Sequence, residues 1–319
     1  MIAALAGGVG GAKLARGLAH LLGADLSVIV NTGDDFDHFD LRICPDIDTV
    51  TYTLAGRANP ETGWGQAGES WNFMAQLSEL GGDDWFKLGD RDMALHVLRT
   101  AMLRQGHSLT EITARIAGRY GIKAAILPMT DDSLRTKVQS ADGLLDFQDY
   151  FVRLRCDVAV QGVIFDGAET ARATPQSLAA LDAAEAIVIC PSNPYLSIDP
   201  ILAVADLRQR LLQPQLLPGR VPRVAVSPII GGQAVKGPAA KMMRELGHAV
   251  SSLGVARKYQ GLADALVIDT ADAALQPDIE ALGMRVLVTN TWMRSAEDST
   301  RLAGQVLDFA ASLRANLRA

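Results

Sequence analysis

The sequence predicts an α/β protein with a Rossmann-like, doubly wound and mostly parallel sheet. Short apolar runs alternate with helical patterns at both ends of the chain, and continuous apolar runs are typical of strands buried on both faces of a parallel sheet. The first run, residues 1–6, leads into a glycine cluster and then a helical pattern over residues 12–22. This order of strand, glycine turn and helix is the repeating unit of such sheets.

Six further apolar runs are predicted as strands, and the helical patterns between them are predicted as crossovers. A last helix is predicted to close the sheet, and a proline-rich piece is predicted as a loop that leads into a strand. The strands are expected at residues 26–30, 158–165, 186–190, 224–226, 265–268 and 286–288, the helices at 201–212, 236–246 and 296–317, and the loop at 214–222.

The stretch of residues 63–139 differs in composition and residue spacing from the rest of the chain. It is rich in Met, Trp, Leu and charged residues at helical spacing, and β-branched runs are few before residues 124–127. This pattern predicts a mainly helical insertion that packs over the sheet and forms a lid on a ligand site. We therefore divide the chain into a Rossmann-like core, residues 1–62 and 140–319, and an insertion, residues 63–139.

Composition excludes several classes of protein. The net charge of -6 argues against nucleic-acid binding, because a duplex requires a basic surface. The three cysteines are odd in number and include no CxxC pair, so reduced thiols are expected rather than a disulfide framework or a zinc site. The first apolar run is expected to be a strand rather than a signal peptide, and no apolar stretch is long enough to span a bilayer. We expect a soluble, cytoplasmic protein without a membrane partner.

The glycine cluster GGVGGAK, residues 7–13, matches neither familiar phosphate loop. The dinucleotide fingerprint requires a third glycine where Lys13 stands, and the Walker loop requires Gly before the lysine and Ser or Thr after it. A ligand-free turn is the alternative, but four glycines exceed what a turn requires. We expect the backbone of Gly8, Gly10 and Gly11, with Lys13, to bind a phosphate at the start of the helix.

Acidic residues follow the second predicted strand and open the next helical pattern. Asn31, Asp34 and Asp35 lie where a doubly wound sheet binds ligands, and the two carboxylates could hold a divalent cation, although an Asx turn is the alternative. Asp46 and Asp48 are either a helix cap or a carboxylate pair for magnesium.

Three further motifs add polar groups. Arg91, in the cluster 89–92, either pairs with its neighbours or clamps a phosphate. The ends of two later strands carry Ser192 and Asn193 and, further on, Ser227, Gly231 and Gly232. Several polar strand ends together predict one large crevice. His20 and His96 are interpreted as packing or surface residues, and Trp64 and Trp71 as core or lid residues.

Taken in order, these motifs resemble the CofD/FbiA family, the 2-phospho-L-lactate or phosphoenolpyruvate transferases of coenzyme F-420 biosynthesis. The resemblance runs over nearly the whole chain. It is carried by GGVGGAKL at residues 7–14, NTGDD at 31–35, PDIDTV at 45–50, KLGDRD at 87–92, LPMTDD at 127–132, FQD at 147–149, PSNP at 191–194 and SPIIGG at 227–232.

The resemblance implies a magnesium-dependent enzyme. A hydroxyl of the deazaflavin Fo would attack the phosphate that bears a lactyl or enolpyruvyl group in a guanosine diphosphate-linked donor, and GMP would leave. The resemblance also implies a homodimer. By matching motifs, Asp46, Asp48 and Arg91 would be catalytic, Asp46 and Asp48 would hold Mg²⁺, the glycine turn would lie near the diphosphate, and Ser192, Asn193 and residues 227–232 would hold the guanosine.

Two other functions are considered beside the transferase. A regulatory, nucleotide-sugar-binding protein like the gluconeogenesis factor YvcK would share the strand–glycine–helix opening and bind without transferring a group. An NAD-dependent oxidoreductase is disfavoured because Lys13 replaces the third glycine. The aspartate pairs and the LPM sequence at residues 127–129 favour the transferase.

Overall fold

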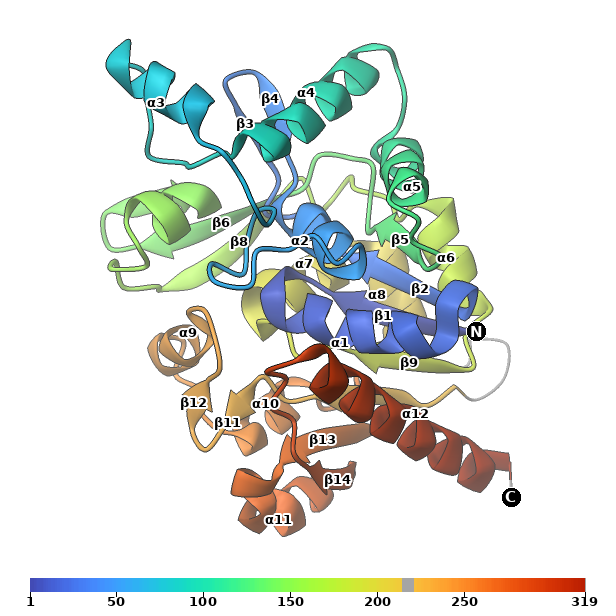
Figure 1. The fold of residues 1–319 in the computed structure, drawn as a ribbon. Coiled ribbons are helices and arrows are strands. Elements are labelled where there is room, and N and C mark those ends of the chain that lie inside the picture. The colour runs from blue at the N-terminus through green and yellow to red at the C-terminus, as the bar shows by residue number, and fades with distance from the viewer. Residues whose placement is uncertain (214–220, 319) are drawn as a thin grey trace.

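The computed structural model describes residues 1–213 and 221–318, and a seven-stranded parallel sheet forms its centre (Figure 1). The strand order is β14-β13-β10-β9-β1-β2-β5. The chain moves outward from β1 through β2 to β5, then returns to β9 on the other side of β1 and moves outward the opposite way. The reversal creates a topological switch point between β1 and β9. The strands are β1 (Ile2–Ala6), β2 (Leu26–Val30), β5 (Ala125–Pro128), β9 (Ala186–Ile189), β10 (Arg223–Val226), β13 (Ala265–Asp269) and β14 (Arg285–Thr289).

The inner strands are buried on both faces, which explains their continuous apolar sequences. Successive residues of a strand point to opposite faces. Leu5 therefore packs with Ile29 and Ile189 in one hydrophobic core, whereas Ala6 and Val30 pack in the core on the other face. The predicted Rossmann-like sheet is confirmed.

Helices cover both faces of the sheet. On one face, α1 and α12 lie side by side, and α2 packs next to α1 (Figure 1). Shorter helices cover the opposite face. The first set comprises α1 (Gly8–Leu22), α2 (Pro45–Leu54) and α12 (Ala296–Arg318); the second comprises α6 (Pro175–Asp182), α7 (Asp199–Ala203), α8 (Ala205–Leu212), α9 (Ala239–Glu245), α10 (Ser252–Lys258) and α11 (Gln276–Glu280).

Three of these helices differ from their predicted bounds. α1 begins at Gly8 rather than at residue 12, so most of the glycine cluster belongs to the first helical turn. The helix predicted at 201–212 is divided by Val204, whose extended ψ of 110° ends α7 and precedes α8. α9 begins only at Ala239, after a proline. Most of the loop predicted at 214–222 lies outside the described residues.

One predicted strand was assigned to the wrong sheet. Residues 158–165 were expected in the parallel sheet, but β8 (Gly162–Asp166) pairs antiparallel with β6 (Arg135–Ser140) at the edge of a separate sheet whose other edge is β7 (Gly143–Asp146). Val163 and Phe165 pack against the main core, while Ile164 is exposed. An apolar run at a partly exposed edge has the same appearance as a fully buried strand.

The stretch 63–139 contains α3 (Asn72–Glu79), α4 (Asp90–Arg104) and α5 (Leu109–Arg119), and also β5, which is the edge strand of the central sheet. The hairpin of β3 (Phe36–His38) and β4 (Leu41–Ile43) packs against α4. In Figure 1 α3, α4 and the hairpin stand beyond α2, at the top of the view. A small core of Tyr52, Leu95, Met102, Ile112 and Ile116 joins α4 and α5 to α2.

The remaining elements are short. A hairpin of β11 (Ile229–Ile230) and β12 (Gln233–Ala234) precedes α9. Single turns of 3-10 helix, η1 (Gly23–Asp25) and η5 (Thr270–Leu275), and of π-helix, η2 (Asp149–Arg153) and η3 (Pro194–Ile198), connect larger elements. Among the residues that the structure describes, every helix is too short or too polar to cross a membrane.

Candidate active site

A cavity of about 860 Å³ lies at the carboxyl ends of the parallel strands, over the switch point between β1 and β9. Its wall includes the start of α1, the start of α2, the loop after β9 and the loop after β10. Segments of the insertion line the other side, among them residues 64–65 and 85–87 and one face of α4, and Thr62, directly before the insertion, also lines the cavity. The crevice expected from the polar strand ends is therefore formed by both parts of the chain.

The glycine turn brings three loops into close contact. A Cβ atom on Gly10 would lie 2.3 Å from the Pro191 carbonyl oxygen, and one on Gly11 would lie 2.3 Å from Ser192 Oγ. The Gly7 N–H donates to Ser192 Oγ at 3.1 Å, and the Gly8 N–H donates to Asp46 Oδ1 at 2.6 Å. Close packing therefore requires glycine at positions 10 and 11, whether or not a ligand is bound. Helix geometry leaves the N–H groups of Val9 and Gly10 without intrahelical acceptors.

Asp46 and Asp34 form a buried acidic centre beside this turn. Asp46 Oδ2 accepts a hydrogen bond from Asn31 Nδ2 at 2.9 Å. Burial raises the pKa of Asp46 to about 6, and burial together with the charge of Asp46 raises the pKa of Asp34 well above its ordinary value. Asp34 Oδ1 is buried without a hydrogen-bond partner in the described structure. Two buried carboxylates with one unsatisfied oxygen form a site that a cation would stabilise.

Asp48 lies in different surroundings from Asp46. Both of its carboxylate oxygens accept hydrogen bonds from the Arg99 guanidinium, one of them at 3.1 Å. His96 Nδ1 lies 3.8 Å from Asp48 Oδ2, and Arg99 and His96 are both almost fully buried. At the start of α2, Asp46 therefore contacts the glycine turn and Asp48 contacts the insertion.

Two lysines also line the cavity. Lys13 Nζ donates to the Met293 carbonyl oxygen at 3.0 Å, and Lys236 Nζ donates to the Thr62 carbonyl oxygen at 2.6 Å. Burial lowers the pKa of Lys13, and the positive charges of Lys236 and Arg16 lower it further. Cations that repel one another in this way favour an anion between them. Lys236 also links the β12–α9 loop to the insertion.

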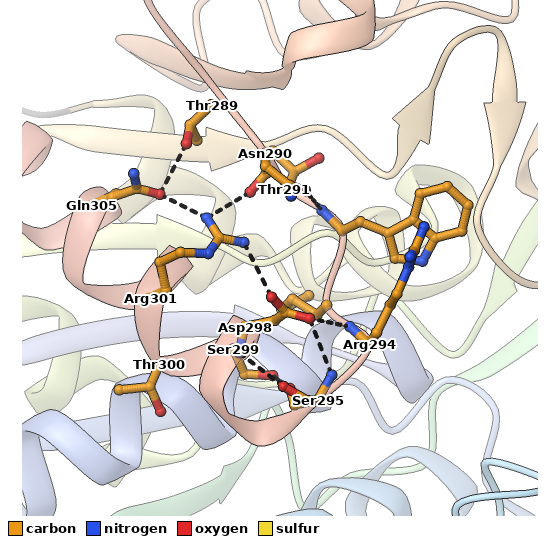
Figure 2. Close-up of polar contacts among 12 residues, drawn as sticks. Thr289, Asn290, Thr291, Arg294, Ser295, Asp298, Ser299, Thr300, Arg301 and Gln305 are labelled. Atoms are coloured by element: carbon orange, nitrogen blue, oxygen red, sulfur yellow. Dashed lines mark hydrogen bonds and ion pairs between the residues drawn. The ribbon is translucent and has the colours of Figure 1, made fainter.

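A polar network fixes the loop that accepts the hydrogen bond of Lys13 (Figure 2). Asp298, at the start of α12, accepts hydrogen bonds from the backbone N–H groups of Arg294 and Ser295 at 3.0 and 3.3 Å. Arg301 Nη1 donates to the Asn290 carbonyl oxygen at 2.9 Å and to Gln305 Oε1 at 3.0 Å. The loop between β14 and α12 is thereby held against the cavity, where residues 291–293 form part of the wall.

Aromatic side chains line the outer part of the cavity. Trp64, Trp85, Phe151 and Trp292 all contribute to the wall. Trp64 and Trp292 are 44% and 43% exposed, and the Arg294 guanidinium covers one face of the Trp292 ring. A cavity with charged groups at its base and exposed rings at its rim suits a ligand with a charged part and a planar part.

The predicted site residues divide into two groups. Nine line the cavity and six do not. The lining residues are Gly8, Gly10, Lys13, Asp34, Asp46, Asp48, Ser192, Asn193 and Ser227; the others are Gly11, Asn31, Asp35, Arg91, Gly231 and Gly232.

The residues outside the wall have structural contacts of their own. Asn31 supports Asp46, and Asp35 is buried, which raises its pKa to about 7. Gly231 donates its N–H to Asp272 Oδ2 at 3.2 Å. Arg91 donates to the Ala67 carbonyl oxygen at 2.9 Å. Of these contacts, only that of Asn31 reaches a residue of the cavity wall.

Sequence reasoning missed the residues of α4 that do reach the site. Asp92, His96 and Arg99 follow an i, i+4, i+7 spacing, which places polar side chains on one helix face. This spacing was visible in the sequence, but His96 was interpreted as an isolated packing or surface residue. Lys236 follows a strand and two glycines, an order that indicates a phosphate or base site, whereas Trp292 gave no comparable signal, since a single residue in a loop carries no periodicity.

The fold and the site define a Rossmann-like α/β protein whose cavity suits an anionic ligand. Comparison with known proteins gives the family. The family model for 2-phospho-L-lactate transferase CofD matches residues 2–292. The chain belongs to the CofD family and is a transferase of the 2-phospho-L-lactate transferase type.

Two relatives and one solved structure illustrate the similarity. A phosphoenolpyruvate transferase of Streptomyces griseus subsp. griseus is 40% identical over 321 residues, covering 98% of this chain and 99% of the relative. A 2-phospho-L-lactate transferase of Methanocaldococcus jannaschii is 38% identical over 318 residues, with 98% and 99% coverage. The crystal structure of protein BH3568 from Bacillus halodurans superposes with a TM-score of 0.62 at 16% identity, covering 96% of this chain and 98% of that chain. The last comparison supports the fold alone.

Proposed function

We propose that this protein transfers a 2-phospholactyl or enolpyruvyl-phosphate group from a guanosine diphosphate-linked donor to a ribityl hydroxyl of the deazaflavin Fo. GMP is released, and the product belongs to coenzyme F-420 biosynthesis. The observation that carries the proposal is the distribution of charge in one cavity. Lys13 and Lys236 line it together with Asp34, Asp46 and Asp48, which suits a diphosphate that is handled beside carboxylates.

The donor diphosphate is placed at the switch point, against the first turn of α1. Backbone N–H groups at a helix start and the helix dipole stabilise phosphate oxygens. Lys13 and Lys236 face the same region and add positive charge. Ser192, Asn193 and Ser227, at the next two strand ends, are placed on the guanosine part of the donor.

The acidic centre fits a magnesium ion. Asp34 Oδ1 is buried without a hydrogen-bond partner in the described structure, and burial and the charge of Asp46 raise the pKa of Asp34. Carboxylate oxygens are the ligands that Mg²⁺ prefers in phosphate sites. Asp34 and Asp46 would hold the ion, which neutralises the charge of a diphosphate when it is bound. Both oxygens of Asp48 accept hydrogen bonds from Arg99, and we assign Asp48 to the binding of the acceptor substrate Fo rather than of the ion.

The acceptor Fo is placed between the insertion and the sheet edge. Its flat deazaflavin ring would lie among the aromatic side chains Trp64, Trp85 and Phe151. The ribityl chain would then extend toward Asp48, which can accept a hydrogen bond from the attacking hydroxyl and orient it.

The reaction requires positioning more than covalent catalysis. The ribityl hydroxyl oxygen forms a bond to the phosphorus that carries the lactyl or enolpyruvyl group. The bond from that phosphorus to the oxygen shared with the GMP phosphate breaks, and the electron pair leaves on GMP. The hydroxyl proton is released toward Asp48 and then to solvent. The product is a phosphodiester.

The test is turnover of purified protein with Fo and, separately, the guanylated derivatives of phospholactate, phosphoenolpyruvate and phosphoglycerate. We expect GMP release that depends on Fo and a phosphodiester of matching mass. Asp48→Asn should lower the rate by about 100-fold, since misplacement of a reacting group has effects of that size. Asp146→Asn, which alters an exposed carboxylate paired with Lys137, is the matched control and should keep the wild-type rate.

Two outcomes would overturn the proposal. Donor binding without GMP release would favour the regulatory alternative, a nucleotide-sugar-binding protein without transfer. Tight binding of NADH with no donor binding would favour an oxidoreductase.

A further inference from the structure

We propose that Arg99, on the helical insertion, is the positioning residue that holds the Asp48 carboxylate in the cavity wall. The inference rests on the proposed function, in which Asp48 orients the acceptor hydroxyl. It assigns to the insertion a direct part in the reaction in addition to covering the site. No motif in the sequence pointed to this residue.

The geometry comes from two facing helices. Asp48 and Tyr52 are one turn apart on α2, and Asp92, His96 and Arg99 share one face of α4. All five side chains are buried. The helices thus meet through polar side chains at the base of the cavity, above the small hydrophobic core that joins α4 to α2.

The contacts in this group converge on Asp48. The Arg99 guanidinium donates to both Asp48 oxygens and also to the Arg42 carbonyl oxygen at 3.2 Å. The last bond ties the guanidinium to the end of β4 and restricts its rotation. A bidentate pair fixes both the position and the plane of the carboxylate.

The rest of the group is bound to Asp92. Tyr52 donates its hydroxyl to Asp92, and His96 Nε2 lies 3.5 Å from Asp92 Oδ1. Asp92 is therefore occupied by other partners, which leaves Arg99 as the principal partner of Asp48. Asp48 thus pairs with Arg99, whereas Asp92 pairs with Tyr52 and His96.

The charge of Arg99 is permanent. Burial alone would lower the pKa of Arg99, but the neighbouring carboxylate outweighs burial and keeps the guanidinium protonated. A buried guanidinium cannot lose its proton under ordinary conditions, so it requires a carboxylate next to it. The pair holds the Asp48 carboxylate in place in the wall of the cavity.

A metal ion is the competing explanation for the same cluster. Ligand atoms of Asp48, Asp92 and His96 lie within 4.8 Å of one another. An ion placed there would lie beside the Arg99 guanidinium, whose positive charge would repel it. The permanent cation already supplies the charge that an ion would bring, so we assign this position to Arg99.

Arg99 acts through Asp48 and not on the substrate itself. Asp48, Tyr52, Asp92 and His96 line the cavity, whereas Arg99 lies behind them. Its loss should therefore lower kcat more than it changes KM for the donor. A merely structural residue would instead change stability and leave the kinetic constants of the folded fraction unaltered.

The experiment is chemical rescue with a matched control. Arg99→Ala should lower kcat by about 100-fold, and millimolar guanidinium should restore part of it, while urea should not. The control is Arg223→Ala. Arg223 is also buried and makes a bidentate pair, with Asp264, through contacts of 3.0 and 2.7 Å, but it lies at the amino end of β10, away from the cavity. This variant should lose stability, keep the wild-type kcat and show no rescue.

A second comparison covers the case in which Arg99→Ala does not fold. Arg99→Lys keeps the positive charge but loses the two guanidinium nitrogens that donate together to Asp48. It should lower kcat by about 10-fold. Combined with Asp48→Asn, it should lower kcat no further, because residues that act as a unit are not additive.

The outcomes are distinguishable. A wild-type protein that transfers no group to Fo overturns the proposed function and this inference with it. An active wild type whose Arg99 variants keep their kcat overturns the inference alone. So does an Arg99→Lys effect that persists in full in the Asp48→Asn background.

Discussion

The same substitution, glycine to alanine, should have opposite effects at two helical positions of this protein. At Gly10, in the first turn of α1, an added Cβ would lie 2.3 Å from the Pro191 carbonyl oxygen. Ordinary contacts begin at 3.4 Å, so the loops after β1 and β9 must separate by about 1 Å. At Gly118, in α5, nothing lies within 4 Å of the added atom, and the residue is exposed.

The magnitudes follow from packing and helix propensity. Overpacking against backbone costs about 1–3 kcal/mol, and alanine recovers about 0.5–1 kcal/mol of helix propensity. Gly10→Ala should therefore lower the free energy of unfolding by about 1–2 kcal/mol. Gly118→Ala should raise it by about 0.5–1 kcal/mol. The two variants should thus differ by about 1.5–3 kcal/mol although the substitution is the same.

The assay is urea denaturation of wild type and both variants, followed by calorimetric binding of GDP as a donor fragment. Gly10→Ala should bind GDP more weakly, because separation of the loops opens the switch point, and Gly118→Ala should bind it as wild type does. Equal stability of the two variants would refute the packing argument. Unchanged GDP binding by a destabilised Gly10→Ala would remove the glycine turn from the donor site.

Three further outcomes are expected. Burial raises the pKa of Asp35 to about 7 from an ordinary 3.8, so the folded state binds more protons and its stability falls as pH rises from about 4 to about 7. Melting curves at several pH values should show that the stability of Asp35→Asn increases relative to that of wild type over this window. Equal changes in stability of the two proteins with pH would contradict the shift. Ser108 and Glu111 form a capping box at the start of α5, so Ser108→Ala should lose about 1 kcal/mol of stability with an unchanged rate of GMP release. Fo should slow amide hydrogen exchange in residues 60–100, where the insertion lines the cavity, and exchange that is indifferent to Fo would place the acceptor elsewhere.

The parts of the fold that follow from local patterns could be predicted from the sequence. β1, β2, β9 and β13 are continuous apolar runs because both faces of the sheet are covered. β8 has a similar sequence but lies at a partly exposed edge. Neighbouring strands, not the residues of the run, determine which sheet a strand joins, and neighbours are not visible in a single segment.

The strand-end motifs could be predicted to converge, but their individual contacts could not. The carboxyl ends of parallel strands meet at one edge, so the motifs after β1, β2, β9 and β10 all lie near the cavity. The contact of Gly7 with Ser192 spans 185 positions. No local spacing encodes such a contact, and only the strand order produces it.

The motif at residues 89–92 shows how a helix divides adjacent residues between two environments. Successive residues of an α-helix are rotated by about 100° because a turn contains about 3.6 residues. Arg91 therefore bonds to the Ala67 carbonyl oxygen outside the cavity, while Asp92, the next residue, lies in the buried face with His96 and Arg99. The motif is visible in the sequence, but the partner helix determines which face is buried, because Asp48 on α2 pairs with Arg99 and Tyr52 on α2 donates to Asp92. A polar i, i+4, i+7 pattern in one helix is therefore best interpreted together with a polar i, i+4 pattern in another, since buried charges require partners.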